Sequence, residues 1–149
     1  YNPAYCAKYL EYLKIGFPRI DFEVSESKFE TLANLGQNLI DLHLMKTIPQ
    51  DKDIELKFRD GANKSNPNFT LDKPKYESQQ NVIVLNADLE IVGISQEVWD
   101  CTIGGYKVLD KWLKYRTSIT LEQSDFTHIL NVAKILKATI AIQTQLAEI

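Results

Sequence analysis

Three lysines in the second half of the chain recur at steps of four and three residues: Lys107, Lys111 and Lys114. Because an α-helix has 3.6 residues per turn, this spacing places the three ammonium groups on one helix face. The opposite face is apolar and consists of Val108, Leu109, Trp112 and Leu113. A row of exposed ammonium groups can contact the phosphates of a nucleic acid, although lysines also simply solvate the outer face of a packed helix. Composition alone favours the second interpretation.

A pair of glycines, Gly104 and Gly105, stands at the start of this expected helix, which covers about residues 106–116. Backbone N–H groups at a helix N-terminus have no partner within the helix and can bind a phosphate, and glycine lets the anion approach closely. The charge distribution points to the same place, since residues 104–116 hold four basic side chains and one acidic one in a chain of net charge −3. The lysines and the glycines together are therefore the candidate phosphate-binding group.

A second candidate lies in residues 59–81, a segment rich in Asn, Gln and Lys and poor in apolar side chains. Arg and Lys can read guanine edges in DNA, and Asn and Gln can read adenine edges. The same residue types are common in flexible turns, and without further information solvated coil is the simpler interpretation. A long structureless stretch inside a compact domain is, however, usually functional or mobile.

No pattern of catalytic or metal-binding residues is recognisable. His43 and His128 have apolar neighbours and no Cys, Asp or Glu at the spacing of a catalytic triad or a zinc site. Cys6 and Cys101 lie far apart in the sequence with no second Cys or His near either one, so we expect both to be buried, reduced thiols of an intracellular protein. We therefore expect no catalytic residue, no bound metal and no cofactor in this chain.

Hydrophobic periodicity predicts the helices and strands that must position the two candidate groups. An opening helix is capped by Asn2 and ended by Gly16, and a capping box at 27–30 announces a second helix that runs to about residue 44. Alternating apolar and charged residues predict a half-buried strand over 54–58.

The later elements complete the pattern. A short extended piece is expected near Tyr76, and residues 82–85 and 90–94 predict a β-hairpin followed by a helical turn capped by Ser95. A second capping box at 120–123 opens a long final helix. The sequence therefore predicts an α+β fold, in which a small, mainly antiparallel sheet is flanked by helices and braced by a long C-terminal helix.

Composition narrows the class of protein. The chain has 149 residues, of which 44% are hydrophobic and 25% are charged, as in ordinary globular domains. No apolar run approaches the roughly 20 residues that a membrane-spanning helix needs. The first residue is Tyr1 and the single methionine is Met45, so we expect residues 1–149 to be one domain cut from a longer protein.

Residues 98–116 read Val-Trp-Asp-Cys-Thr-Ile-Gly-Gly-Tyr-Lys-Val-Leu-Asp-Lys-Trp-Leu-Lys-Tyr-Arg. This segment closely resembles a block, approximately V-W-x-x-x-I-G-G-Y-x-V-L-x-K-W-L-K-x-R, of the C-terminal specificity domain of type ISP restriction–modification enzymes and related single-chain enzymes. Residues 5–20 resemble the family's tyrosine-rich helix followed by F-P-R-I, and residues 35–44 resemble its L-G-x-x-L-I-x-L-H-L helix. With the terminal helix, the blocks cover nearly the whole chain. Residues 59–81 match no fixed family pattern, as expected of a segment that sets which DNA sequence is read.

The resemblance implies a target-recognition domain that binds double-stranded DNA and does not catalyse. Adenine-N6 methyltransferase and nuclease parts would lie upstream in the same polypeptide, and S-adenosylmethionine and magnesium would belong to those parts. One domain would then select the site for both methylation and cleavage. The alternative is a structural module that docks on the methyltransferase part and touches DNA little.

The resemblance also gives the candidate residues their expected roles. Phosphate contacts are expected from the basic row and the glycine pair: Lys107, Lys111, Lys114, Gly104 and Gly105. Base reading is expected from polar side chains of the variable segment: Arg59, Asn63, Lys64, Asn66, Lys73, Lys75, Gln79 and Gln80. For Tyr106 and Trp112 we favour a packing role over a DNA contact.

Overall fold

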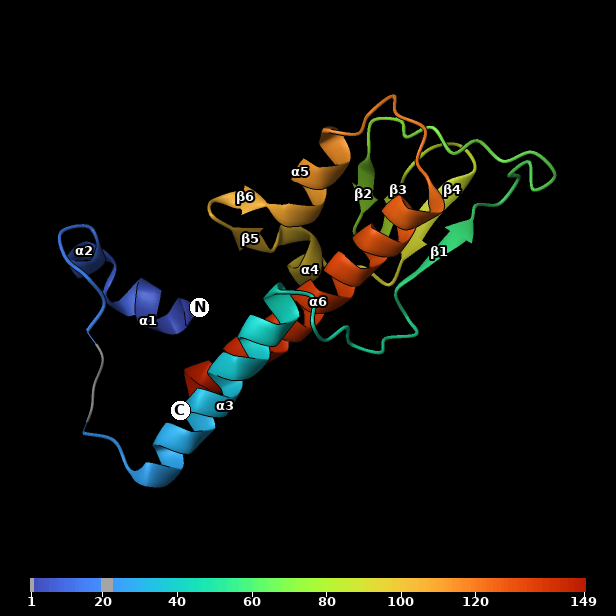
Figure 1. Cartoon of the computed structure of the whole chain (residues 1–149). Helices are drawn as coiled ribbons and strands as arrows, with labels where there is room; N and C mark the ends of the chain where they lie inside the picture. The colour runs from blue at the N-terminus through green and yellow to red at the C-terminus, as the bar shows by residue number, and fades with distance from the viewer. Residues whose placement is uncertain (1, 20–22) are drawn as a thin grey trace. The chain divides into compact units, whose positions relative to one another are not determined.

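The computed structural model describes residues 2–19 and 23–149 (Figure 1). The chain forms two compact units: Ile48–Lys137 is one, and Tyr1–Thr47 together with Ala138–Ile149 is the other. Helix α6, Gln123–Glu148, contributes its first part to one unit and its last part to the other. The long C-terminal helix expected from the sequence is therefore present.

The unit of residues 48–137 is built on a four-stranded antiparallel sheet. Its strands are β1 (Glu55–Phe58), β2 (Lys75–Glu77), β3 (Val82–Val84) and β4 (Leu89–Val92), in the order β1-β4-β3-β2. The half-buried strand, the extended piece near Tyr76 and the hairpin are thus confirmed, and so is the α+β class. The register pairs Phe58 with Leu89 at one end of the sheet and Glu77 with Val82 at the other.

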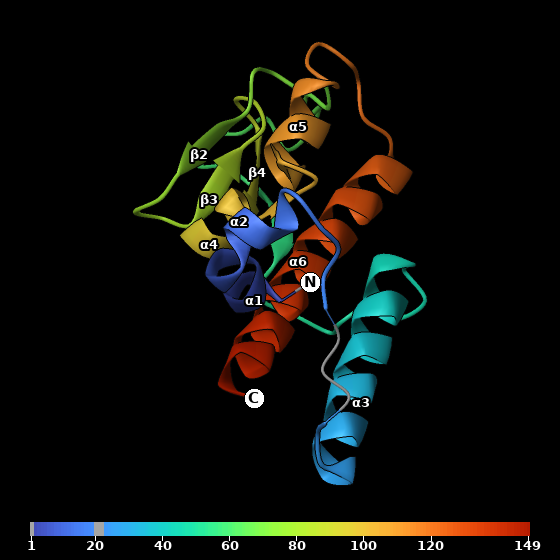
Figure 2. The same ribbon diagram turned by 90° about the vertical axis from the view of Figure 1, so that its left-hand side faces the viewer.

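Helices cover the sheet on one side. Figures 1 and 2 show α5 (Val108–Lys114) and the first turns of α6 on the same side of the strands. Their apolar side chains meet those of the sheet in a core whose members are almost fully buried: Ile83, Ile91, Leu109, Leu113, Ile129 and Leu136. The apolar faces that the sequence assigned to strands and helices are therefore the faces that pack.

A short helix, α4 (Gln96–Asp100), connects the sheet to α5. Ser95 caps it as predicted, because its hydroxyl accepts a hydrogen bond from the backbone N–H of Val98. The ring of Trp99 stacks on Tyr76 at 5.0 Å between centroids, and the Tyr76 hydroxyl donates to the carbonyl oxygen of Ile94 at 2.9 Å. Burial of this side chain raises the pKa of Tyr76. These contacts fix α4 against the edge strand β2.

The other unit consists of helices. Its helices α1 (Pro3–Lys8) and α2 (Leu10–Leu13) replace the single opening helix predicted from the sequence, because the backbone of Tyr9 leaves the helical conformation. Helix α3 spans Glu26–His43. Its N-cap is Ser25, whose hydroxyl accepts a hydrogen bond from the N–H of Lys28. The helix therefore begins two residues earlier than predicted, and the predicted capping box at 27–30 does not form.

Helix α3 runs antiparallel to the last part of α6 within this unit. His43 Nε2 lies 3.1 Å from Thr139 Oγ1, and at the other end of α3 the Lys28 ammonium donates to the backbone oxygen of Ile149 at 2.7 Å. Thr139 is buried, as are Leu39 and Leu42 of α3. Burial lowers the pKa of His43.

Candidate functional site

The glycine pair lies at the tip of a β-hairpin and not at the start of a helix. Strands β5 (Thr102–Ile103) and β6 (Tyr106–Lys107) are joined by Gly104 and Gly105, whose φ angles are 61° and 82°. A two-residue hairpin turn of this type needs positive φ at both positions, which glycine adopts without strain. Helix α5 begins only at Val108, so the predicted position of the glycines at the N-terminus of this helix is wrong. Phosphate contact by the hairpin backbone remains a prediction.

Two of the three lysines face carboxylates. Lys107 Nζ lies 2.5 Å from Asp100 Oδ1, and Lys114 Nζ lies 2.7 Å from Asp110 Oδ2. The hydrogen bond from Lys107, together with a second one from Gln96, lowers the pKa of Asp100, which is therefore ionised at neutral pH. The positive charge of the predicted row is partly balanced within the domain itself.

Lys111 has a different environment. Its ammonium lies 3.3 Å from the ring centroid of Tyr106 and 5.9 Å from that of Tyr115, and no carboxylate pairs with it among the described residues. A cation over an aromatic face is stabilised without being neutralised. Lys111 is therefore the member of the row whose charge is most available to an anion.

Trp112 and Tyr106 differ in their surroundings. Trp112 is half-buried, stacks on His128 at 5.8 Å and carries the guanidinium of Arg116 at 3.8 Å from its ring centroid. This arrangement fits the packing role that the sequence favoured for Trp112. Tyr106, in contrast, is 59% exposed, so the packing role expected for it is not what the structure shows.

The variable segment is held by two residues of the β3–β4 turn that the sequence analysis did not single out. The Asp88 carboxylate accepts hydrogen bonds from the backbone N–H groups of Asn68 at 2.8 Å and Asn63 at 3.0 Å, and these bonds lower its pKa. The buried side chain of Asn86 donates to the carbonyl oxygens of Asn68 and Thr70 and accepts from the N–H groups of Asp88 and Leu89. Segment 63–70 is therefore a pinned loop and not free coil.

A second attachment holds the same segment from the other side. The N–H of Leu71 donates to the oxygen of Ile119, and the N–H of Leu121 donates to the oxygen of Phe69, both at 2.9 Å. Between them the hydroxyl groups of Thr70 and Thr120 lie 2.9 Å apart. Helix α6 begins at Gln123, so Thr120 is not its N-cap and the predicted capping box at 120–123 does not form.

The eight candidate base-reading residues do not converge on one place. Arg59, Asn63, Lys64 and Asn66 follow β1 and lie beyond the sheet end marked by the Asp88 turn, whereas Gln79 and Gln80 occupy the β2–β3 turn at the opposite end. Lys73 and Lys75 lie before and on β2, at the edge of the sheet. The structure thus divides them among three places on the sheet: four at one end, two at the other end and two at an edge.

Their electrostatic surroundings also differ. Arg59 pairs with Glu90 at 3.3 Å and donates to the oxygen of Asn86, and Lys75 pairs with Glu77 at 2.8 Å. The exposed side chains of Lys64 and Lys73 make no ion pair or hydrogen bond within residues 2–19 and 23–149. Lys64 and Lys73 are therefore the cations of this segment that a polyanion can reach without displacing a carboxylate.

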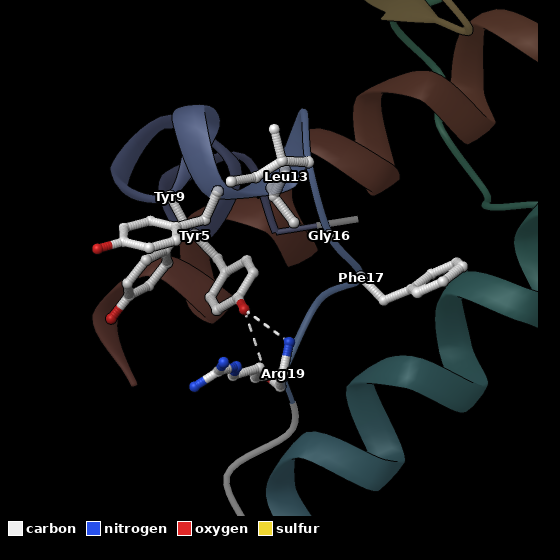
Figure 3. A pocket seen from close by; sticks show the side chains of 8 residues that line it. Tyr5, Tyr9, Leu13, Gly16, Phe17 and Arg19 are labelled. Atoms are coloured by element: carbon white, nitrogen blue, oxygen red, sulfur yellow. Dashed lines mark hydrogen bonds between the residues drawn. The ribbon is translucent and has the colours of Figure 1, made fainter.

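The helical unit contains a groove lined by aromatic side chains. It has a volume of about 640 Å³ and is bordered by residues of α1, α2 and the chain that follows: Tyr5, Tyr9, Tyr12, Leu13, Ile15, Gly16, Phe17 and Arg19. Figure 3 shows the Tyr5 hydroxyl directed at the backbone of Arg19, where it donates to the carbonyl oxygen and accepts from the N–H. Phe17 points away from the tyrosine rings and is 96% exposed.

No group of three or more His, Cys, Asp or Glu side chains comes together within the described ranges. Cys6 is exposed and Cys101 is half-buried, so neither thiol is buried as the sequence predicted. No helix among the described residues is long and apolar enough to cross a membrane.

Comparison with known protein families identifies a match to one family model. The model of the Type ISP C-terminal specificity domain matches residues 1–144. No curated protein sequence matches the chain.

Three solved structures resemble the fold. They are the ATP-dependent Type ISP restriction–modification enzyme LlaBIII bound to DNA (20% identity, TM-score 0.61, 97% of this chain), a nuclease-deletion mutant of the Type ISP enzyme LlaGI with a DNA substrate mimic (21%, 0.62, 99%) and a DrdV–DNA complex (19%, 0.66, 97%). The chain spans 10%, 12% and 16% of the length of these three proteins.

Proposed function

Because the chain belongs to the family of Type ISP C-terminal specificity domains, we propose that it recognises a specific double-stranded DNA sequence for a restriction–modification enzyme. The observation that carries this proposal is the family match, which extends over residues 1–144. The three solved proteins with a similar fold were each determined with DNA or a DNA mimic, which supports the same function.

The proposal places the chemistry elsewhere in a longer polypeptide. Methyl transfer to adenine N6 and DNA cleavage would be performed by upstream parts in the cytoplasm, and S-adenosylmethionine and magnesium would bind there. This chain would supply binding and site selection only. It would also contact those upstream parts, since the similar solved proteins are several times longer than this chain.

Within this function the candidate residues take graded roles. The row of Lys107, Lys111 and Lys114, with the hairpin backbone of Gly104 and Gly105, would contact phosphates and so position the duplex. Among the candidate base-reading residues, Lys64 and Lys73 have no carboxylate partner that they would have to leave before they contact DNA. The side-chain amides of Gln79 and Gln80 lie exposed on a turn. Arg59 would first have to leave Glu90, so we rank it last.

Fluorescence anisotropy of a labelled duplex, titrated with the 149-residue chain at several salt concentrations, tests the proposal. We expect binding at low salt whose affinity falls steeply as salt rises, because each lysine–phosphate contact releases counterions. Absence of binding at low salt would overturn direct DNA recognition by this chain.

A second candidate function has its own supporting observation. Ile15 and Phe17, beside the tyrosine groove, expose most of their apolar surface to solvent, which is typical of a surface that another protein segment covers. The chain would then be a docking module that packs on the methyltransferase part and makes little DNA contact. The same anisotropy experiment separates the two functions, since a docking module would not bind DNA at low salt.

A further inference from the structure

The tip of the β5–β6 hairpin, formed by Gly104 and Gly105, is open to solvent. All four of its strand residues are exposed, and a Cβ atom built on either glycine of the turn meets no other atom within 4 Å. The packing of α5 does not depend on the hairpin tip, because Leu109 and Leu113 supply its buried contacts. The exposed tip therefore contributes little to the core of the domain.

One face of the hairpin is apolar although it faces solvent. Ile103 and Tyr106 are cross-strand partners, so both side chains lie on the same face, and they are 41% and 59% exposed. The other face carries Thr102 and Lys107, which also form a cross-strand pair. The exposed aliphatic and aromatic pair, next to a glycine turn without side chains, offers a small apolar surface that a ligand can cover.

A cation accompanies this apolar pair. The Lys111 ammonium lies 3.3 Å from the Tyr106 ring centroid, on the hairpin face that Lys107 does not share. Lys107 and Lys114 are paired with Asp100 and Asp110, whereas Lys111 has no such carboxylate among the described residues. Ile103, Tyr106 and Lys111 thus combine two apolar side chains with an unneutralised positive charge.

We propose that the face formed by Ile103, Tyr106 and Lys111 is a sequence-independent clamp on the backbone of duplex DNA. The Ile103 and Tyr106 side chains pack against deoxyribose, the Lys111 ammonium contacts the adjoining phosphate, and the bare glycine turn lets the two backbones approach closely. A DNA backbone presents this combination of apolar sugar and anionic phosphate at every step, which matches the composition of the face. The clamp rests on the proposed function and specifies which residues hold the duplex without reading its sequence.

The test uses the 149-residue chain with two duplexes of unrelated sequence, titrated at several salt concentrations. Ile103→Ala should weaken binding about fivefold or more on both duplexes with the salt dependence unchanged, because it removes apolar contact only. Tyr106→Ala should weaken binding at least as much on both duplexes, because it removes apolar contact and also the ring on which the Lys111 ammonium lies. Lys111→Gln should weaken binding and lower the slope of log affinity against log salt by about 0.9, the value for one phosphate contact.

Matched variants control for folding and for the chemistry of the ring. Thr102→Ala truncates the opposite face of the same hairpin and should leave affinity within about twofold, and Tyr106→Phe, which keeps the ring, should bind like the wild type. NMR of the wild-type chain tests the clamp without any substitution. The methyl resonances of Ile103 should shift when DNA is added.

The outcomes separate the clamp from the proposed function. Wild-type binding with unchanged affinity in Tyr106→Ala and no shift at Ile103 would overturn the clamp and leave DNA recognition intact. Loss on one duplex only would overturn its independence of sequence. If the wild-type chain binds no duplex at low salt, both the clamp and the proposed function are overturned.

Discussion

The Lys107 ammonium lies 2.5 Å from a carboxylate oxygen of Asp100, across the base of the β5–β6 hairpin. Both side chains are nearly half exposed, so the pair lies in solvent and adds little to the stability of the fold. Its main consequence is electrostatic, because it cancels one charge of the row that would face phosphates. In the proposed DNA-bound state, this pair would weaken the attraction between the basic row and the phosphates.

Replacing this carboxylate should release the lysine. We expect Asp100→Asn to raise the affinity of the chain for duplex DNA of any sequence and to steepen its salt dependence, because one more ammonium becomes free for a phosphate. Asparagine can keep the contact with Gln96, so the fold should be retained. Anisotropy titrations of both proteins measure the effect, and Glu97→Gln, an exposed acid of the same helix without this pair, is the control. Equal affinities for Asp100→Asn and the wild type would show that Lys107 does not contact DNA.

The side chain of Asn86 should be needed for stability. It is 4% exposed and makes four hydrogen bonds, two to the carbonyl oxygens of segment 68–70 and two within the β3–β4 turn. Asn86→Ala leaves buried backbone groups without partners, so we expect the free energy of unfolding to fall by about 2–3 kcal/mol in urea denaturation. Asn66→Ala, at an exposed position of the same loop, should change it by less than about 0.5 kcal/mol. A loss below about 1 kcal/mol in Asn86→Ala would contradict the pinned loop.

Gly93 should tolerate no side chain. Its φ is 78°, and a Cβ atom on it would overlap the carbonyl oxygen of Asp53. Gly93→Ala therefore introduces both backbone strain and a clash. We expect the free energy of unfolding to fall by at least about 2 kcal/mol in urea denaturation. Gly61→Ala is the matched control, because Gly61 has a φ of 81° and nothing within 4 Å of its Cβ position. Equal losses in the two variants would show that the contact with Asp53 does not matter.

The stability of the helical unit should depend on pH near neutrality. Burial lowers the pKa of His43 below its ordinary value of 6.5, so folding favours the neutral ring. The unfolded chain therefore takes up the proton first, and the stabilisation is complete above pH 6.5 and is lost as the pH falls through the lowered pKa. The urea midpoint should drop between pH 7.5 and 5.5 in the wild type and drop less in His43→Gln. A urea midpoint that rises as the pH falls from 7.5 to 5.5 would contradict the lowered pKa of His43.

The sequence correctly predicts the strands and caps whose determining residues lie within a few positions of one another. The alternation at 54–58, the hairpin around Asn86 and the Ser95 cap all follow from neighbouring side chains, and each is present in the structure. The glycine turn at 104–105 was misplaced because its strands have only two residues each, and the strong helical pattern after Val108 was extended backwards over them.

The site could be predicted only in part for the same physical reason. Helical spacing brought Lys111 and Lys114 to one helix, but it says nothing of Asp100, which meets Lys107 across a hairpin. The hydrogen bonds of Asp88 to Asn63 and Asn68 join residues 20 or more positions apart, beyond any local periodicity. The separation of the base-reading candidates likewise depends on strand order, which pairs β1 with β4 and β2 with β3.

Selection of the 149-residue chain against a randomised duplex library at low salt, followed by sequencing of the bound fraction, tests the central claim most directly. A specificity domain predicts enrichment of one short, defined motif. Binding without enrichment of any motif would contradict sequence recognition by this chain, even if its lysines hold DNA.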